Sequence, residues 1–93
     1  MDLNLKDKVV FVTGGGSGIG AAISMALAQE GAVPVICGKN PLEESFEQAL
    51  RALQPRTRFF QFELMEEAAC AKAINDTAAE FGRIDGLVNN AGV

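Results

Sequence analysis

The sequence predicts an α/β fold built on a parallel β-sheet, and two observations carry that prediction. Short apolar runs alternate with longer amphipathic stretches along the 93 residues, in the order β-α-β-α-β-α-β. The apolar runs are continuous, which is typical of strands that are buried on both faces. This alternation predicts right-handed crossovers and helices on both faces of the sheet, that is, a doubly wound arrangement.

The first strand and the first helix flank a run of glycines. The strand is expected at residues 8–13, KVVFVT, and it ends in the glycine-rich segment 13–20, TGGGSGIG. A helix is expected over residues 18–31, where Gly31 provides a suitable end. Apolar residues at every fourth position predict its buried face: Ile19, Ile23 and Leu27.

The second strand and helix follow the same order. Residues 33–37, VPVIC, form a short apolar strand in which Pro34 is tolerable because it stands near the start. Asn40 is expected to cap the next helix, with Pro41 at its first position, and Pro55 ends it. The expected buried face of this helix consists of Leu42, Phe46, Leu50 and Leu53.

The last elements are a phenylalanine-rich strand at 58–64, a helix at 66–81 capped by Gly82, and an apolar strand at 84–89. The expected buried face of the helix consists of Cys70, Ile74, Thr77, Ala78 and Phe81. Nothing in the sequence would cover the outer edge of the last strand, and complete domains avoid an exposed apolar edge. We therefore expect residues 1–93 to form one segment, the first half of a doubly wound domain, truncated before its second half.

The composition argues against several classes of protein. The net charge is −4 and the basic residues are scattered, which argues against nucleic acid or a membrane surface as a partner. No apolar stretch is long enough to span a membrane. The chain has no signal peptide, so we expect a cytoplasmic protein with reduced cysteines.

The missing residue types limit the chemistry. The chain contains no histidine and no tyrosine, which excludes a histidine relay or a phenolic proton donor within these residues. The two cysteines, Cys37 and Cys70, lack CxxC spacing, and we therefore expect no metal site. No residue of this chain is predicted to be catalytic.

The glycine-rich segment has the properties of a phosphate-binding loop. Glycines allow the backbone to approach a ligand closely, and the helix that follows directs free N–H groups and a positive dipole end toward the loop. Between a strand and a helix of a βαβ unit, such a loop suits a pyrophosphate. The alternative is a flexible turn that binds nothing.

Other phosphate loops and acidic sites fit less well. Gly15 and Gly20 have the glycine spacing of a P-loop, but Ala21 stands where the P-loop lysine would be. A receiver domain of the flavodoxin-like class would carry clustered aspartates at the end of the first strand, where this chain has glycines. A dinucleotide fingerprint fits loosely, as Gly16, Gly18 and Ala21.

Two motifs make the chain similar to a known family. Residues 13–20 read as T-G-x-x-x-G-x-G and residues 89–92 as N-N-A-G, with FGRI before DGLVNNAG. With both motifs at this separation, the whole chain resembles the short-chain dehydrogenase/reductase family. Within it, the chain most resembles bacterial sugar dehydrogenases of the L-fucose dehydrogenase kind. The resemblance implies a Rossmann-type fold, of which this chain is the N-terminal half.

The resemblance also implies which residues contact a nicotinamide dinucleotide. The implied contacts along the motifs and after the third strand are Gly14, Gly16, Ser17, Gly18, Ile19, Gly20, Glu63, Leu64, Asn90, Ala91 and Gly92. The resemblance implies that Ser17 and the backbone N–H of Ile19 bind phosphate oxygens, and that Gly14 begins the turn. Gly18 and Gly20 allow close approach of the cofactor and the helix.

The remaining implied positions lie around the nucleoside. Glu63 and Leu64 match adenine contacts, although the family often has Asp or Asn where Glu63 stands. Asn90 begins the segment that runs beside the riboses, and Asn89 helps to fix the sheet. The alternative for both asparagines is a simple turn after a strand.

The loop after the second strand bears on the choice between NAD and NADP. A carboxylate there would bind the ribose 2′-hydroxyl of NAD. Glu43 and Glu44 come too late, one turn into the predicted helix, and Lys39 stands with Asn40 where a 2′-phosphate would lie. We therefore predict binding of NADP or NAD with a preference for NADP. Ser17 occupies the family's second basic position and gives no support, and Lys39 as a solvated loop charge is the alternative.

The resemblance implies an oxidoreductase as the parent protein. Family members transfer a hydride between nicotinamide and an alcohol or carbonyl carbon, with a Tyr-x-x-x-Lys pair and a serine that this chain does not contain. We expect the parent protein to be an oligomer. We expect these 93 residues to contain only its cofactor-binding half and to have no activity alone. The alternatives are a non-catalytic dinucleotide-sensing or interaction module and a structural fragment that binds nothing.

Overall fold

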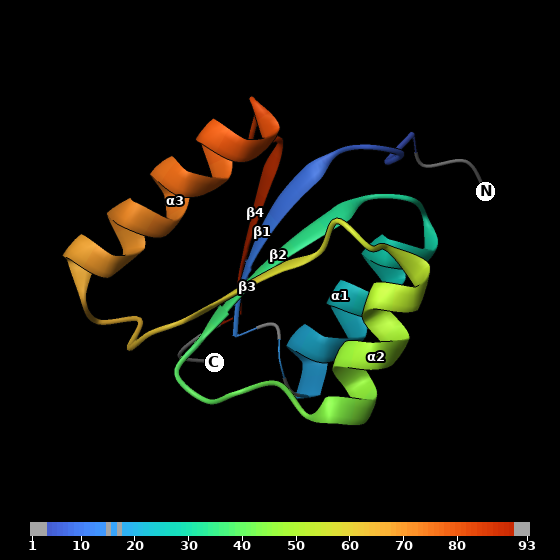
Figure 1. Ribbon diagram of the computed structural model, residues 1–93, viewed down its shortest axis with the longest axis horizontal. Helices are drawn as coiled ribbons and strands as arrows, with labels where there is room; N and C mark the ends of the chain where they lie inside the picture. Colours follow the sequence, from blue (N-terminus) through green and yellow to red (C-terminus); the bar gives the residue numbers. More distant parts are fainter. Residues whose placement is uncertain (1–3, 15, 17, 91–93) are drawn as a thin grey trace.

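The computed structural model describes residues 4–14, 16 and 18–90. Within these residues, four parallel strands form one sheet in the order β3-β2-β1-β4 (Figure 1). The strands are β1 (Val9–Thr13), β2 (Val33–Gly38), β3 (Arg58–Gln61) and β4 (Gly86–Asn89). The helices that connect them are α1 (Gly18–Gln29), α2 (Glu44–Leu53) and α3 (Glu67–Phe81). The predicted fold class and element order are therefore confirmed.

The helices cover both faces of the sheet, as the alternating pattern predicts. Figure 1 shows α1 and α2 on one face and α3 on the other. One apolar cluster lies beneath α3 and contains Val9, Phe11, Val33, Val35, Cys37 and Ala73. The second lies beneath α1 and α2 and contains Ala28, Ile36 and Leu50. Because β1 and β2 contribute to the core from consecutive positions, they read as continuous apolar runs.

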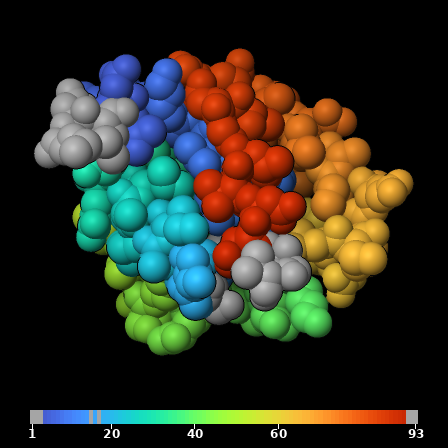
Figure 2. Space-filling view, turned by 180° about the vertical axis from the view of Figure 1, so that it is seen from behind, coloured from blue at the N-terminus to red at the C-terminus, as the bar shows by residue number. Residues whose placement is uncertain are grey.

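Strand β4 differs from the central strands. It pairs with β1 through the register Val10↔Gly86 to Thr13↔Asn89, and its residues alternate between half-buried and exposed. Figure 2 shows this segment on the surface between α1 and α3, and the side chain of Leu87 is 66% exposed. Among the described strands, β4 and β3 are the two edges of the sheet.

Helix α1 faces the sheet with small residues rather than with the predicted apolar ones. Its buried residues are Gly20, Ser24 and Ala28, whereas Ile19 is 67% exposed. The reason is close packing, because a Cβ atom at Gly20 would overlap the carbonyl oxygen of Gly14. The predicted buried face of Ile19, Ile23 and Leu27 is therefore wrong, and the face that packs on the sheet lies one residue further along the chain.

Helix α2 begins later than the sequence indicates. Its N-cap is Glu43 and its first residue is Glu44, so Asn40 and Pro41 belong to a loop and the predicted cap at Asn40 is wrong. Glu44 and Glu47 place negative charge in the first turn, where the helix dipole favours it. Leu42 still packs against the core, but it does so from the loop.

The third strand and helix are close to their predicted positions. Strand β3 ends at Gln61, three residues earlier than expected. Helix α3 ends at Phe81 and is capped by Gly82, whose φ of 75° gives the expected left-handed cap. The buried residues of α3 are Ala73 and Thr77, while Ile74 is 45% exposed. In the part of the chain that the structure describes, no helix has the length and apolar character needed to cross a bilayer.

Candidate functional site

A pocket of about 720 Å³ opens at the carboxyl edge of the sheet, where the strands end. The ends of three strands contribute Thr13, Gly38 and Asn89 to its lining. In parallel α/β sheets, ligands bind at this edge because the loops after the strands meet there. The pocket therefore lies where the fold itself predicts a site.

The glycine-rich segment forms the wall of the pocket between β1 and α1. Gly14 and Gly16 line the pocket, and the N–H of Gly14 donates a hydrogen bond of 2.7 Å to the carbonyl of Cys37 on β2. Gly14 and Gly18 have φ values of 69° and 56°, which glycine adopts without strain. Helix α1 starts at Gly18, so its positive end points toward the loop. Ser17, a predicted phosphate contact, lies outside the described residues.

Gly20 and Asn90 pack the glycine loop against the end of β4. A Cβ at Gly20 would lie 2.8 Å from Asn90 Nδ2 as well as overlapping the carbonyl oxygen of Gly14. The Asn90 side-chain amide donates a hydrogen bond of 3.4 Å to that same carbonyl. Gly20 therefore keeps open the space in which the loop and the second motif meet.

Thr13 joins the two motifs at the end of β1. Its Oγ1 donates to Asn89 Oδ1 at 3.0 Å and accepts from the N–H of Asn90 at 3.2 Å. The Asn90 N–H also reaches the Thr13 carbonyl at 3.2 Å. Sequence reasoning included Thr13 in the first motif but assigned it no role. Because Thr13 and Asn89 are 76 residues apart, only their place in the two motifs could have indicated the contact.

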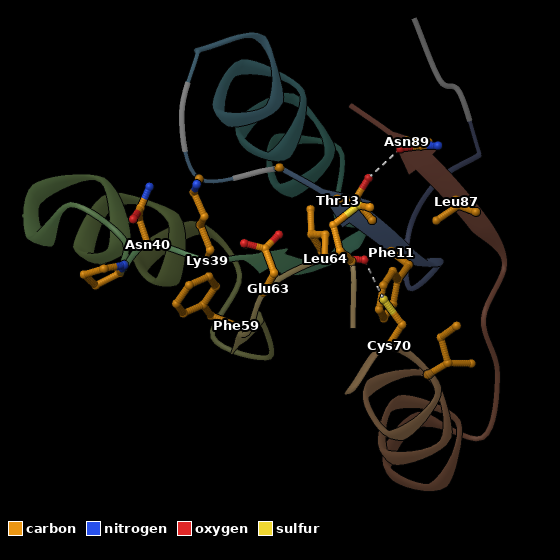
Figure 3. Close-up of a pocket in the computed structure, with 16 residues that line it drawn as sticks. Phe11, Thr13, Lys39, Asn40, Phe59, Glu63, Leu64, Cys70, Leu87 and Asn89 are labelled. Atoms are coloured by element: carbon orange, nitrogen blue, oxygen red, sulfur yellow. Dashed lines mark hydrogen bonds between the residues drawn. The ribbon is translucent and has the colours of Figure 1, made fainter. Parts of the chain in front are cut away.

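Lys39, Asn40 and Glu63 form the polar wall of the pocket, opposite the end of β1. Figure 3 shows Lys39 and Glu63 with their charged ends directed to the same side of the pocket. The carbonyl of Lys39 accepts a hydrogen bond of 3.2 Å from Gln61 Nε2. Within the described residues, no ion pair engages Lys39 or Glu63. These two charges are therefore available to a ligand.

The pocket continues into an apolar part between β1, β4 and α3. Leu64, a predicted adenine contact, lines it with residues that the sequence did not single out, which are Phe11, Ile74 and Leu87. Cys70 also lines it, and its Sγ donates to the Leu64 carbonyl at 3.6 Å. An aromatic ring could rest against this surface beside the charged wall. Ala91 and Gly92, the remaining predicted contacts, lie outside the described residues.

Few groups near the pocket can perform acid–base or metal chemistry. Burial, together with the proximity of Cys70, raises the pKa of the Cys37 thiol to about 12. That thiol is therefore protonated and unreactive at neutral pH. Among the described residues, no three side chains of the metal-binding types gather together. The described residues that line the pocket combine two charged side chains, Lys39 and Glu63, with an apolar surface.

Comparison with known proteins identifies what this arrangement is similar to. A family model described as short chain dehydrogenase matches residues 8–93. The L-fucose dehydrogenase of Bos taurus is 42% identical over 85 residues, which is 91% of this chain and 30% of that protein. The chain thus spans about a third of the length of this curated relative.

Solved structures show the same likeness. The crystal structure of Cj0485 dehydrogenase superposes with a TM-score of 0.95 at 35% identity, over 100% of this chain and 35% of that one. The NADH-dependent reductase A1-R′, solved in complex with NAD, superposes with a TM-score of 0.85 at 32% identity. That match covers 100% of this chain and 39% of the reductase.

Proposed function

Because the chain belongs to the short-chain dehydrogenase family, we propose that it supplies the nicotinamide-dinucleotide-binding half of an oxidoreductase. The observation that carries the proposal is the contact between the two motifs at the pocket. Thr13 links the glycine loop to Asn89 and Asn90 by hydrogen bonds of 3.0 and 3.2 Å. The NAD complex of the similar reductase A1-R′ supports the choice of ligand.

The ligand would lie across the carboxyl edge of the sheet. The pyrophosphate would face the glycine loop and the N-terminus of α1, where backbone N–H groups and the helix dipole favour negative charge. The adenine would rest on the apolar part of the pocket at Leu64, with Glu63 beside it. The riboses would face Asn90.

The parent protein would transfer a hydride between the nicotinamide and an alcohol or carbonyl carbon. The cofactor supplies the hydride chemistry when it is bound, and these residues bind and orient it. A sugar substrate is proposed from the likeness to an L-fucose dehydrogenase. The chain has no tyrosine or histidine, so the 93 residues alone are proposed to be inactive.

We further propose that the site prefers NADP over NAD. Lys39 follows β2 and lines the pocket together with Gly16, so its ammonium group can reach a 2′-phosphate on the adenosine ribose. No carboxylate occupies residues 38–42, the place from which NAD-specific sites bind the 2′-hydroxyl. A lysine paired with a phosphate forms a charge-assisted hydrogen bond, which is roughly twice as strong as a neutral one.

Substitution of Lys39→Asp tests the preference. Isothermal titration of the purified protein with NADP⁺ and with NAD⁺ gives the ratio of the two dissociation constants. We expect the preference for NADP⁺ to fall by about tenfold or more, because a charge-assisted hydrogen bond contributes roughly 1.5–3 kcal/mol. The control is Lys72→Asp, which makes the same charge change on α3, where Lys72 pairs with Asp76. An unchanged ratio in the Lys39 variant would refute the preference.

A second candidate is a dinucleotide-sensing or interaction module without catalysis. The contact between the two motifs at the pocket would serve such a module equally, because binding needs no catalytic group. The gene itself distinguishes the two candidates. A reading frame that continues into a Tyr-x-x-x-Lys pair supports the oxidoreductase, and a frame that ends without one supports the module.

A further inference from the structure

Leu42 fills the space in front of Gly16. A Cβ atom added at Gly16 would lie 2.8 Å from Leu42 Cδ2, which is the only non-neighbouring described atom within 4 Å of that position. The backbone of Gly16 lies outside the left-handed region, so an alanine there would meet no backbone strain, but the end of the Leu42 side chain would have to move away from it. The two residues are therefore matched in size.

The Leu42 side chain is held in place by the core. It packs against the cluster of Ala28, Ile36 and Leu50, which come from α1, β2 and α2. Leu42 nevertheless precedes α2, whose N-cap is Glu43, so its position depends on packing and not on helical hydrogen bonds. It connects the core of the domain to the glycine loop.

The loop that Leu42 anchors carries the charged wall of the pocket. Lys39, Asn40 and Pro41 line the pocket and directly precede Leu42. At the start of this loop, Gln61 Nε2 donates a hydrogen bond of 3.2 Å to the Lys39 carbonyl. The loop is therefore fixed at one end by Gln61 and at the other by Leu42.

We propose that Leu42 is a positioning residue that holds the Lys39 loop against the glycine loop and so sets the affinity for the dinucleotide. The inference rests on the proposed function. Its physical basis is preorganisation, because a loop that is already ordered loses less entropy when a ligand binds. A large ligand that touches both loops benefits from a fixed spacing between them.

A purely structural leucine would behave differently. Removal of such a side chain lowers stability through the lost apolar burial and the cavity, and leaves ligand affinity unchanged once the protein is folded. Removal of a positioning leucine lowers the ligand affinity as well, and the size of that loss depends on the residue at position 16. This dependence is the distinguishing signature.

A double-mutant cycle of Gly16→Ala and Leu42→Ala tests the proposal. The dissociation constant of NADP⁺ is measured by calorimetry, because the chain has no tryptophan or tyrosine for intrinsic fluorescence. We expect each single variant to bind about tenfold more weakly, which corresponds to 1.4 kcal/mol. We expect the double variant to bind no more weakly than Gly16→Ala alone, because the alanine methyl group then occupies the space that Leu42 has left.

Two controls separate positioning from folding. Phe46→Leu removes volume from a side chain that packs against the same core cluster, and it should lower the melting temperature without changing the NADP⁺ affinity. Leu42→Met keeps the side-chain volume, so its NADP⁺ affinity should stay close to that of wild type, in contrast to Leu42→Ala. Where Leu42→Ala does not fold, Leu42→Val takes its place in the cycle, with a smaller loss of affinity.

The outcomes distinguish this inference from the proposed function. If wild-type protein binds neither NADP⁺ nor NAD⁺, the proposed function fails and the inference fails with it. If wild-type protein binds but Leu42→Ala loses only stability, as Phe46→Leu does, the inference alone is wrong. Additive effects of the two substitutions on affinity would likewise refute the coupling.

Discussion

The two ends of the β-sheet are held together in different ways. At the amino end, charged and amide side chains bridge neighbouring segments. At the carboxyl end, glycines and short polar side chains do so, and two charged groups remain without an ion-pair partner among the described residues. If the proposed function holds, the difference teaches that stability and ligand binding depend on opposite edges of one sheet.

The amino end is closed by side-chain bonds to the backbone. Asp85 accepts a hydrogen bond of 2.8 Å from the N–H of Val9 and pairs with Arg83 at 2.6 Å. Gln54 donates to the carbonyl of Ala32 at 3.2 Å and is buried. The bonds from Val9 to Asp85 and from Gln54 to Ala32 connect segments that are 76 and 22 residues apart, so this end resists separation of the strands.

The carboxyl end opens into the pocket, where the proposed ligand would lie. Its motif-to-motif bonds run through Thr13 and Asn90, whose short side chains leave the pocket free. Lys39 and Glu63 face that pocket without neutralising each other.

The largest expected effect is at the carboxyl end, where Gly20→Ala would place a methyl group onto the Gly14 carbonyl and 2.8 Å from Asn90 Nδ2. The Gly14 carbonyl belongs to the backbone and cannot rotate away, so the loop must shift. We expect a loss of stability of about 1–3 kcal/mol, as for an overpacked site, and loss of measurable NADP⁺ binding. Thermal unfolding and calorimetric titration measure the two effects.

Gly86→Ala is the matched control for that substitution. A Cβ at Gly86 would lie 3.8 Å from the Val10 side chain, which is an ordinary contact. This variant should bind NADP⁺ normally. If Gly20→Ala also bound normally, the close approach of the two motifs would not be required for the site.

The glycine loop was predictable from sequence because its signal is local. Consecutive glycines between an apolar run and a helix are visible in eight residues, 13–20, and the element order follows from periodicity alone. The second motif, residues 89–92, is equally local. The sequence therefore indicates both motifs that hold Thr13 and Asn89, but not the hydrogen bond between these two residues.

The remaining features depend on how closely the elements approach. Helix α1 is apolar almost all round, so spacing could not decide between a face with Ile19 and a face with Gly20. The helix buries the face with Gly20 because only a residue without a side chain fits beside the Gly14 carbonyl. The approach of Leu42 to Gly16 is not predictable from sequence for a similar reason. A helix that starts at Pro41 would include Leu42, whereas α2 starts at Glu44 and leaves Leu42 in the loop before it.

A smaller effect is expected at the amino end from Asp85→Asn. The Arg83 hydrogen bond, followed by that of the Val9 N–H, lowers the pKa of Asp85 below its ordinary value. A carboxyl whose pKa is lower in the folded state adds stability above its unfolded pKa of about 3.9 and loses it as the pH falls further. Wild type should therefore melt higher than the variant at pH 7, and the difference should shrink as the pH falls below about 4.

Melting temperatures of wild type and Asp85→Asn, measured by circular dichroism between pH 7 and pH 2.5, test whether the difference shrinks at low pH. Asp76→Asn is the control, because it removes an exposed pair with Lys72 on α3 and should change the melting temperature less. The NADP⁺ affinity of Asp85→Asn at pH 7 should equal that of wild type. A loss of affinity there would show that the two ends of the sheet are not separate in function.

The smallest expected effect concerns the exposed ion pair between Asp7 Oδ1 and Arg56 Nη2, at 2.6 Å. Both side chains are about half exposed, so the pair should contribute only about 0.2–1 kcal/mol and less in high salt. Asp7→Asn removes the charge and keeps a residue that tolerates the φ of 64° found there. Chemical denaturation at low and high salt measures the contribution.

Asp7→Ala separates the charge from the backbone at the same position. Alanine loses the ion pair as asparagine does, but it also suffers in the left-handed region, which costs an L-residue without a short polar side chain roughly 1–2 kcal/mol. The part of the loss that salt removes is the ion pair with Arg56, and the part common to all salt concentrations is backbone strain. If the two variants were equally destabilised, the charge of Asp7 and not its backbone conformation would set the stability of the amino end.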